Sequence, residues 1–160
     1  TPDGRIAGND HDADPARFET HHLEIAEPDQ VQIYEAIMVD PAGAVTTGLL
    51  RAVRYLKDNR LLPRGFDKET ADTDISVRGA AMVDPDFDGD GDRVRYLVDP
   101  GTAAGPFRID AELLYQTIAF RWAENLRAYD APEPRRFLSF YEPMAGSSMI
   151  RLVRSSAVVR

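Results

Sequence analysis

Residues 107–115 hold the most regular pattern in this sequence, the period-two alternation of a β-strand. Apolar and aromatic residues alternate there with mostly charged ones: Phe107, Ile109, Ala111, Leu113 and Tyr115 against Arg108, Asp110, Glu112 and Leu114. Successive side chains of a strand point to opposite faces, so the segment predicts a strand with one apolar face. The chain is therefore expected to build sheets.

Other segments carry strand or helix signals, and turns rich in Asp, Gly and Pro separate them. Alternation from Val31 to Met38 predicts a half-buried strand that ends at the turn of residues 40–43. Strands are also expected over 75–83, 93–98 and 149–159, and helices over 119–130 and 133–142. Thr46-Thr47 can cap a further short helix, whose apolar face would hold Leu49, Leu50, Val53 and Leu56.

Short strands at this spacing predict a mainly β fold, an antiparallel β-sandwich with two or three short helical excursions. This single domain is expected to cover residues 30–160. Residues 1–29 have almost no apolar periodicity and are rich in Asp, Gly and Pro. They predict an extended acidic arm or loop.

The net negative charge of the chain argues against two classes of binding partner. The 160 residues include 27 acidic and 19 basic side chains, which gives a net charge of −8. Nucleic acid and anionic lipid both bind through cationic groups, so neither is an expected partner. No apolar run approaches the roughly 20 residues of a membrane-spanning helix. The absence of cysteine is compatible with a periplasmic or extracellular location but does not require one.

The segment 84–92 places a carboxylate at every second position and is a candidate calcium loop: Asp84, Asp86, Asp88, Asp90 and Asp92. Oxygen ligands with glycines between them are typical of Ca²⁺ loops. The bidentate Glu of an EF-hand is missing, because Arg95 or Leu97 stands at the twelfth position. The alternative is a solvated hairpin turn in which Asp and Gly supply the turn geometry.

Two adjacent histidines, His21 and His22, are candidates for a metal or haem contact, since imidazole ligates transition metals and haem iron. Adjacent residues of an extended chain point to opposite faces, so the two cannot easily share one metal. Exposed polar residues of a loop are the alternative interpretation.

Aromatic and arginine side chains cluster in the C-terminal third and form a candidate interaction set: Trp122, Arg121, Tyr129, Phe137 and Tyr141. Such residues are enriched at protein interfaces, although they also pack helices onto sheets. No nucleophile motif of the G-x-S-x-G type and no H-E-x-x-H motif is present. The chain is therefore expected not to be an enzyme.

A long stretch of the sequence resembles the haem-free β-rich region at the C-terminal end of certain secreted bacterial multihaem c-type cytochromes. The similar segments are Val31-Gln32-Ile33-Tyr34-Glu35, Thr46-Thr47, Leu49-Leu50, Tyr55-Leu56-Lys57-Asp58-Asn59-Arg60-Leu61-Leu62-Pro63, Gly65-Phe66, Gly79-Ala80, Asp92, Val94, Tyr96, Leu114-Tyr115-Gln116 and Arg121-Trp122-Ala123. Two features of that family are missing, the C-x-x-C-H runs that attach haem and a G-H-K-x-P-T-G stretch. Without cysteine the chain cannot hold a c-type haem covalently.

The resemblance implies the C-terminal section of a longer polypeptide whose haems lie upstream. Its role would be that of an accessory domain in extracytoplasmic electron transfer. Its partners would be the haem-bearing part of the same polypeptide or partner cytochromes, and a homodimer is a candidate assembly. The alternative is a calcium-stabilised extracellular binding module, for example one for carbohydrate.

Overall fold

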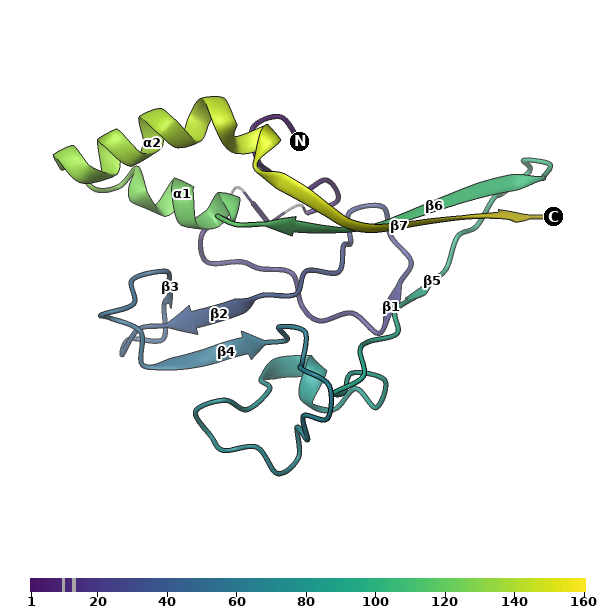
Figure 1. Cartoon of the computed structure of the whole chain (residues 1–160), viewed down its shortest axis with the longest axis horizontal. Helices are drawn as coiled ribbons and strands as arrows, with labels where there is room; N and C mark the ends of the chain where they lie inside the picture. The colour runs from purple at the N-terminus through teal and green to yellow at the C-terminus, as the bar shows by residue number, and fades with distance from the viewer. Residues whose placement is uncertain (10, 13) are drawn as a thin grey trace. The chain divides into compact units, whose positions relative to one another are not determined.

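The computed structural model of the chain, described for residues 1–9, 11–12 and 14–160, divides into two compact units (Figure 1). One unit consists of Ala7–Leu97. The other combines Thr1–Ile6 with Val98–Arg160. Two stretches distant in sequence therefore build the second unit together.

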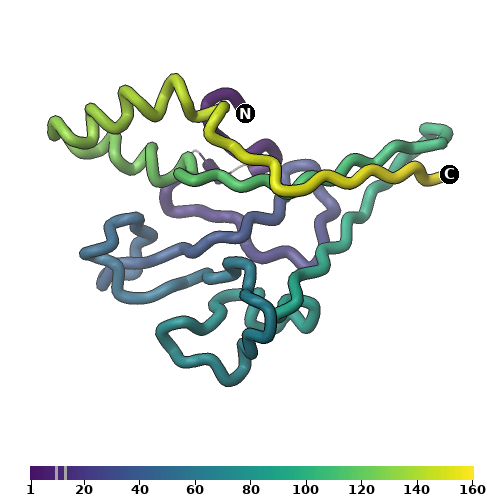
Figure 2. The backbone as a smooth tube through the Cα atoms, viewed as in Figure 1, coloured from purple at the N-terminus to yellow at the C-terminus, as the bar shows by residue number. Residues whose placement is uncertain are grey.

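The unit Ala7–Leu97 contains two small sheets, whose strands are labelled in Figure 1, and the path of its long loops can be followed in Figure 2. Its elements are β1 (Glu24–Ile25), β2 (Ala36–Val39), β3 (Val45–Thr46), β4 (Arg54–Asp58), the 3₁₀ helix η1 (Gly79–Met82) and β5 (Arg95–Tyr96). β2 lies between β3 and β4 in an antiparallel sheet, and β1 pairs with β5 in parallel. A small apolar cluster of Val77, Ala81 and Phe87, flanked by Tyr34 and Leu62, packs beside these elements.

The second unit is a helical hairpin joined to a two-stranded ribbon. It contains β6 (Phe107–Gln116), α1 (Phe120–Leu126), α2 (Pro132–Met144), the 3₁₀ helix η2 (Ala145–Ser147) and β7 (Met149–Val159). Antiparallel pairing of β6 with β7 runs along the full length of β6. The helices enclose a cluster of Ala123, Leu138, Tyr141 and Ala145, with Leu126 and Phe137 packed against it.

The predicted β-sandwich is wrong. Strands make up only 25% of the chain, and they form separate sheets of two, three and two strands. A sandwich needs two sheets whose apolar faces cover each other. Here β6 and β7 instead leave most of their residues exposed on both faces. The alternation in the sequence specified strands correctly but carries no information on what covers them.

Several local predictions are confirmed and two are wrong. The strands over 107–116 and 149–159 and both C-terminal helices are present as β6, β7, α1 and α2. The predicted helix after Thr46-Thr47 is absent: residues 47–53 form a connection between β3 and β4, which both pair with β2, and Leu50 is fully exposed there. The predicted strand over 75–83 contains η1. Short apolar runs fit both the helical and the strand periodicity. For the segment after Thr46-Thr47, pairing of β4 with β2 selected the strand.

Among the described residues, no helix has the length and hydropathy needed to cross a membrane.

Candidate functional site: a buried polar network

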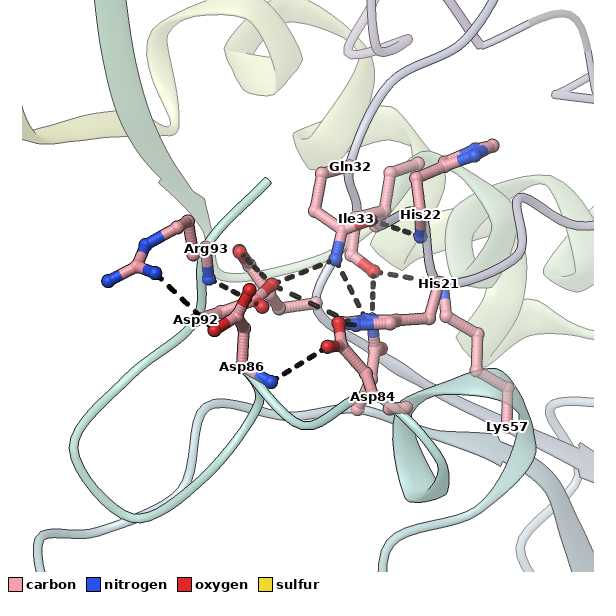
Figure 3. A network of polar contacts seen from close by, with 12 residues as sticks. His21, His22, Gln32, Ile33, Lys57, Asp84, Asp86, Asp92 and Arg93 are labelled. Carbon is pink, nitrogen blue, oxygen red and sulfur yellow. Dashed lines mark hydrogen bonds and ion pairs between the residues drawn. The ribbon is translucent and has the colours of Figure 1, made fainter. Parts of the chain in front are cut away.

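The unit Ala7–Leu97 contains a buried set of polar side chains that bond to one another (Figure 3). We call it the polar network and define it by its members: Glu19, His21, His22, Gln32, Tyr34, Glu35, Lys57, Asn59, Asp84 and Asp92. Six of these residues are buried, and the other four are half-buried. Few polar side chains of a domain are buried to this extent unless they are bonded.

Four separate parts of the chain supply the network. Residues 19–22 precede β1, and residues 32–35 lead into β2. The inner end of β4 contributes Lys57, and Asn59 follows it directly. The acidic segment 84–92 contributes its first and last carboxylates. The network therefore fastens two long loops onto the three-stranded sheet.

The hydrogen bonds around His21 fix its tautomer. Its Nδ1 atom lies 2.8 Å from Gln32 Nε2 and 3.0 Å from Asn59 Nδ2. Both amides are themselves oriented by backbone groups. Gln32 Oε1 accepts from the His22 N–H at 2.8 Å, and Asn59 Oδ1 accepts from the Glu35 N–H at 2.9 Å. Two amide donors facing Nδ1 make it an acceptor, so the proton of the neutral ring is on Nε2.

The Nε2–H of His21 meets two carboxylates. It donates to Asp84 Oδ2 at 2.9 Å, and Asp92 Oδ2 lies 3.9 Å away. All three side chains are almost completely buried, with exposed fractions of 0–1%. Asp84 Oδ1 also accepts from the Asp86 N–H at 2.9 Å. The ring thus links the start of the acidic segment to residues 32 and 59.

Asp92 is held by donors from the segment that leads into β2. Tyr34 Oη donates to Asp92 Oδ2 at 2.7 Å, and Gln32 Nε2 donates to the same oxygen at 3.2 Å. Burial, followed by the hydrogen bond to Asp92, raises the pKa of Tyr34 well above its ordinary value. Tyr34 therefore serves as a protonated donor and not as a base.

Lys57 is the only buried cation of the described polar network. Its Nζ atom donates to Glu19 O at 2.8 Å, to Ile33 O at 2.9 Å and to Glu35 Oε1 at 3.2 Å. Three donors of one ammonium thus meet three acceptors, which satisfies a group only 2% exposed. Nearby, His22 Nε2 bonds Glu19 Oε2 at 2.8 Å, and both of these side chains are buried.

The polar network contains more acidic than basic side chains. One ammonium stands among four carboxylates, those of Glu19, Glu35, Asp84 and Asp92. Buried charges are costly unless they are paired and hydrogen-bonded. Each of these carboxylates accepts from a named donor, so the cost is offset by bonding that depends on the whole network.

The three groups His21, Asp84 and Asp92 bring possible metal-ligand atoms within 4.8 Å of one another. A divalent transition metal would need the lone pair of His21 Nε2, with the ring proton moved to Nδ1. At Nδ1, however, that proton would face the amide groups of Gln32 and Asn59. Calcium prefers oxygen ligands and gains nothing from imidazole. The hydrogen-bonded arrangement therefore fits a His–carboxylate pair better than a metal centre.

The structure separates the five aspartates of the candidate calcium loop. Asp84 and Asp92 point inward to His21, whereas Asp86, Asp88 and Asp90 are exposed. Asp86 pairs with Arg93 at 3.5 Å, and Asp90 pairs with Arg64 at 3.5 Å. Calcium binding by this segment would require the oxygen atoms of the five aspartates to regroup around one ion.

Gly89 has a packing role in the same segment. A Cβ atom at this position would lie 2.6 Å from both the backbone N and the backbone O of Phe66. The segment therefore approaches another stretch of backbone more closely than any side chain allows. In the sequence Gly89 was a candidate turn residue of a calcium loop. In the structure a glycine is needed there for the close contact with Phe66.

The predicted interaction set falls into two groups. Phe137 and Tyr141 stack with ring centroids 5.9 Å apart and belong to the helical core cluster. Trp122 and Tyr129 are exposed, and Arg121 is half-buried. Only the second group is available to a partner.

Sequence reasoning singled out His21, His22, Asp84 and Asp92 but missed Glu19, Gln32, Lys57 and Asn59 as members of one site. Their roles depend on long-range contacts, such as the 38 residues that separate Asn59 from His21. One sequence feature could have drawn attention to Lys57: it is one of only two lysines among 19 basic residues.

Comparison with protein-family models, with curated proteins and with solved structures found no match to this chain.

Proposed function

We propose that the chain is a non-catalytic interaction domain of a secreted multihaem c-type cytochrome, acting in extracytoplasmic electron transfer. The observation that carries the interaction role is the uncovered apolar face of the β6–β7 ribbon. The cytochrome context comes from the sequence resemblance. A periplasmic or extracellular location belongs to the same proposal.

The register of β6 with β7 places ten residues on one face, which we call the apolar ribbon face: Phe107, Ile109, Ala111, Leu113, Tyr115, Ile150, Val153, Ser155, Ala157 and Val159. Five of its larger side chains are about half exposed, between 47% and 57%. At roughly 33 Å long and about 10 Å wide, the face covers on the order of 300 Å². The largest apolar patch on a typical monomer covers about 300–600 Å² and is often functional.

The opposite face of the ribbon holds its charged side chains, which pair with one another beside the exposed Leu114, Met149 and Val158. Asp110 accepts from Arg108 at 3.1 Å and from Arg154 at 3.2 Å. Glu112 accepts from Arg151 at 3.0 Å. Cross-strand ion pairs of this kind belong on a solvated surface. A partner is therefore expected on the apolar face, and the polar face stays in water.

The polar network favours a structural role over catalysis. Its donors and acceptors satisfy one another, as expected for a group of side chains that holds loops in place. A pocket of about 330 Å³ exists in the same unit, but its lining contains no network member: Asp58, Arg60, Leu61, Leu62, Pro63, Phe66, Ile75 and Val77. Catalytic groups are expected to converge on such a pocket.

The expected partner is the haem-bearing part of the same polypeptide or a partner cytochrome. Upstream of Thr1 the reading frame should encode several C-x-x-C-H runs behind a secretion signal. A complete frame without them would contradict the cytochrome assignment.

A binding experiment tests the interaction role directly. The purified haem-bearing segment is mixed with this chain, and the complex is measured by sedimentation velocity using haem absorbance. Val153→Lys on the apolar ribbon face should abolish the complex, whereas Leu50→Lys in the exposed turn between β3 and β4 should leave it intact. Equal binding by both variants would exclude the ribbon face as the docking surface.

A further inference from the structure

Each strand of the ribbon has one edge without a strand partner. In the part of the chain that the structure describes, β6 and β7 pair only with each other. An unpaired edge presents a row of backbone N–H and C=O groups that can bond to another strand. Two-stranded ribbons are marginal by themselves, and additional strands stabilise them.

The two edges carry opposite charge. β6 contains Arg108, Asp110 and Glu112, for a net charge of −1, while β7 contains Arg151 and Arg154 and no acidic residue, for a net charge of +2. The two acids and the arginines of β7 are between 33% and 52% exposed, so they remain available to a neighbouring strand. A strand added beside β7 should therefore carry acids on its polar face, and one added beside β6 should carry arginines.

Pairing of like edges is disfavoured in the registers of greatest overlap. Two antiparallel copies of β6 centred on Ala111 would place Asp110 opposite Glu112 twice. Two copies of β7 centred on Arg154 would oppose that residue to itself. Like charges directly opposite each other destabilise a sheet. These registers therefore do not favour a two-fold dimer through identical edges.

We propose that the ribbon associates with a second copy of this chain, through antiparallel pairing of the β7 edge of one copy with the β6 edge of the next. The register within the ribbon already joins Glu112 to Arg154 and Asp110 to Ser156. Repeating it between copies continues both the charge pairing and the apolar ribbon face. Two adjoining copies present on the order of 600 Å² of continuous apolar face, twice the estimate for one.

Such a contact is head-to-tail, so the free edges at its ends can add further copies. Assembly size should therefore grow with concentration. The inference rests on the ribbon alone and is independent of the cytochrome context. It concerns strand edges, whereas the proposed function concerns the apolar face.

Cysteine pairing tests the arrangement without background, because the chain has no cysteine of its own. Ala111→Cys and Ser155→Cys chains, which place one thiol on β6 and one on β7, are prepared separately. They are then treated with diamide alone and as a mixture. Directly opposite residues of paired strands lie close enough for a disulfide. Only the mixture should give a cross-linked dimer on non-reducing gels.

Cross-linking within either single variant alone would overturn the proposal in favour of like-edge pairing. No cross-link in any sample, together with a monomer at every concentration in sedimentation velocity, would exclude self-association. Circular dichroism of each variant checks that the ribbon is intact. As a control, Leu50→Cys is exposed outside the ribbon and should not cross-link with either partner.

Discussion

His21 Nε2 lies 2.9 Å from Asp84 Oδ2, and neither side chain is more than 1% exposed. This bond joins a loop before β1 to the beginning of the acidic segment, 63 residues further along the chain. It orients the carboxylate inward and leaves the remaining aspartates of the segment, except Asp92, at the surface.

Asp84→Asn should destabilise the protein far more than the same change at Asp88. An amide at position 84 can present N–H groups to the His21 N–H, which leaves buried donors without acceptors. The expected loss is about 2–4 kcal/mol of unfolding free energy for Asp84→Asn. At exposed Asp88 it should be below about 0.5 kcal/mol. Urea denaturation of both variants measures the difference, and equal stabilities would contradict the role of the pair.

The tautomer of His21 can be observed directly. Long-range ¹H–¹⁵N correlation spectra should show a protonated Nε2 and an unprotonated Nδ1, because both amide donors face Nδ1. Adding Zn²⁺ should leave these signals in place, since Nε2 has no free lone pair. A spectrum with the proton on Nδ1, or a zinc-induced shift confined to His21, would favour a metal centre.

Lys57→Met should be among the most damaging single substitutions in the unit Ala7–Leu97. Removal of the ammonium takes its donor from Glu35 and from the Glu19 carbonyl, and leaves Ile33 O with Asn59 Nδ2 alone, at a cost of about 3–5 kcal/mol. Arg64→Met is the matched control, because Arg64 is 93% exposed in its pair with Asp90. Chemical denaturation compares the two. A Lys57→Met protein as stable as the control would show that the network does not depend on its cation.

Tyr34 should not ionise in the range where exposed tyrosines do. Burial and the bond to Asp92 raise its pKa, so the folded state favours the protonated form. The stability that this gives is present below pH 10 and is lost as the pH rises beyond the ordinary tyrosine pKa of about 10.

Phenolate absorbance at 295 nm checks this expectation. Tyr34→Phe should leave the amplitude of the native titration unchanged. By contrast, Tyr96→Phe removes an exposed phenol and should reduce that amplitude. A reduction by Tyr34→Phe at the same pH would show that Tyr34 is accessible.

Calcium should leave the melting temperature unchanged, because only two of the five carboxylates point inward and both are bonded. An ion that binds only the folded state must raise its stability. Melting curves with excess Ca²⁺ and with a chelator measure this. A rise with Ca²⁺ that Asp86→Asn abolishes would favour the calcium-stabilised binding module instead.

Local patterns predicted much of the second unit. The alternation in residues 107–115 was sufficient for β6, and the Pro132-Glu133-Pro134 start was sufficient for α2, because Pro is tolerated in the first turn of a helix. Prediction failed where an apolar segment was so short that the helical and the strand periodicity both fitted it. Leu49 and Leu50 fit a helical face, yet pairing of β4 with β2 placed them in an exposed turn.

The candidate site was only partly predictable. Histidine and aspartate attract attention by type, so His21, Asp84 and Asp92 could be named from the sequence. Gln32 and Asn59 could not be named from the sequence, because an uncharged amide side chain indicates no particular role until the fold fixes its orientation. Their backbone-held amides are what decide the tautomer of His21.

The sequence by itself determined which segments are strands or helices in the C-terminal part, the acidic balance and the lack of covalent haem attachment. These properties depend on residue type and on spacing of a few residues. The tertiary structure alone decided which faces are covered and which aspartates turn inward. It also decided that a lysine would be buried among carboxylates. Those outcomes depend on contacts between residues tens of positions apart, and no local pattern records them.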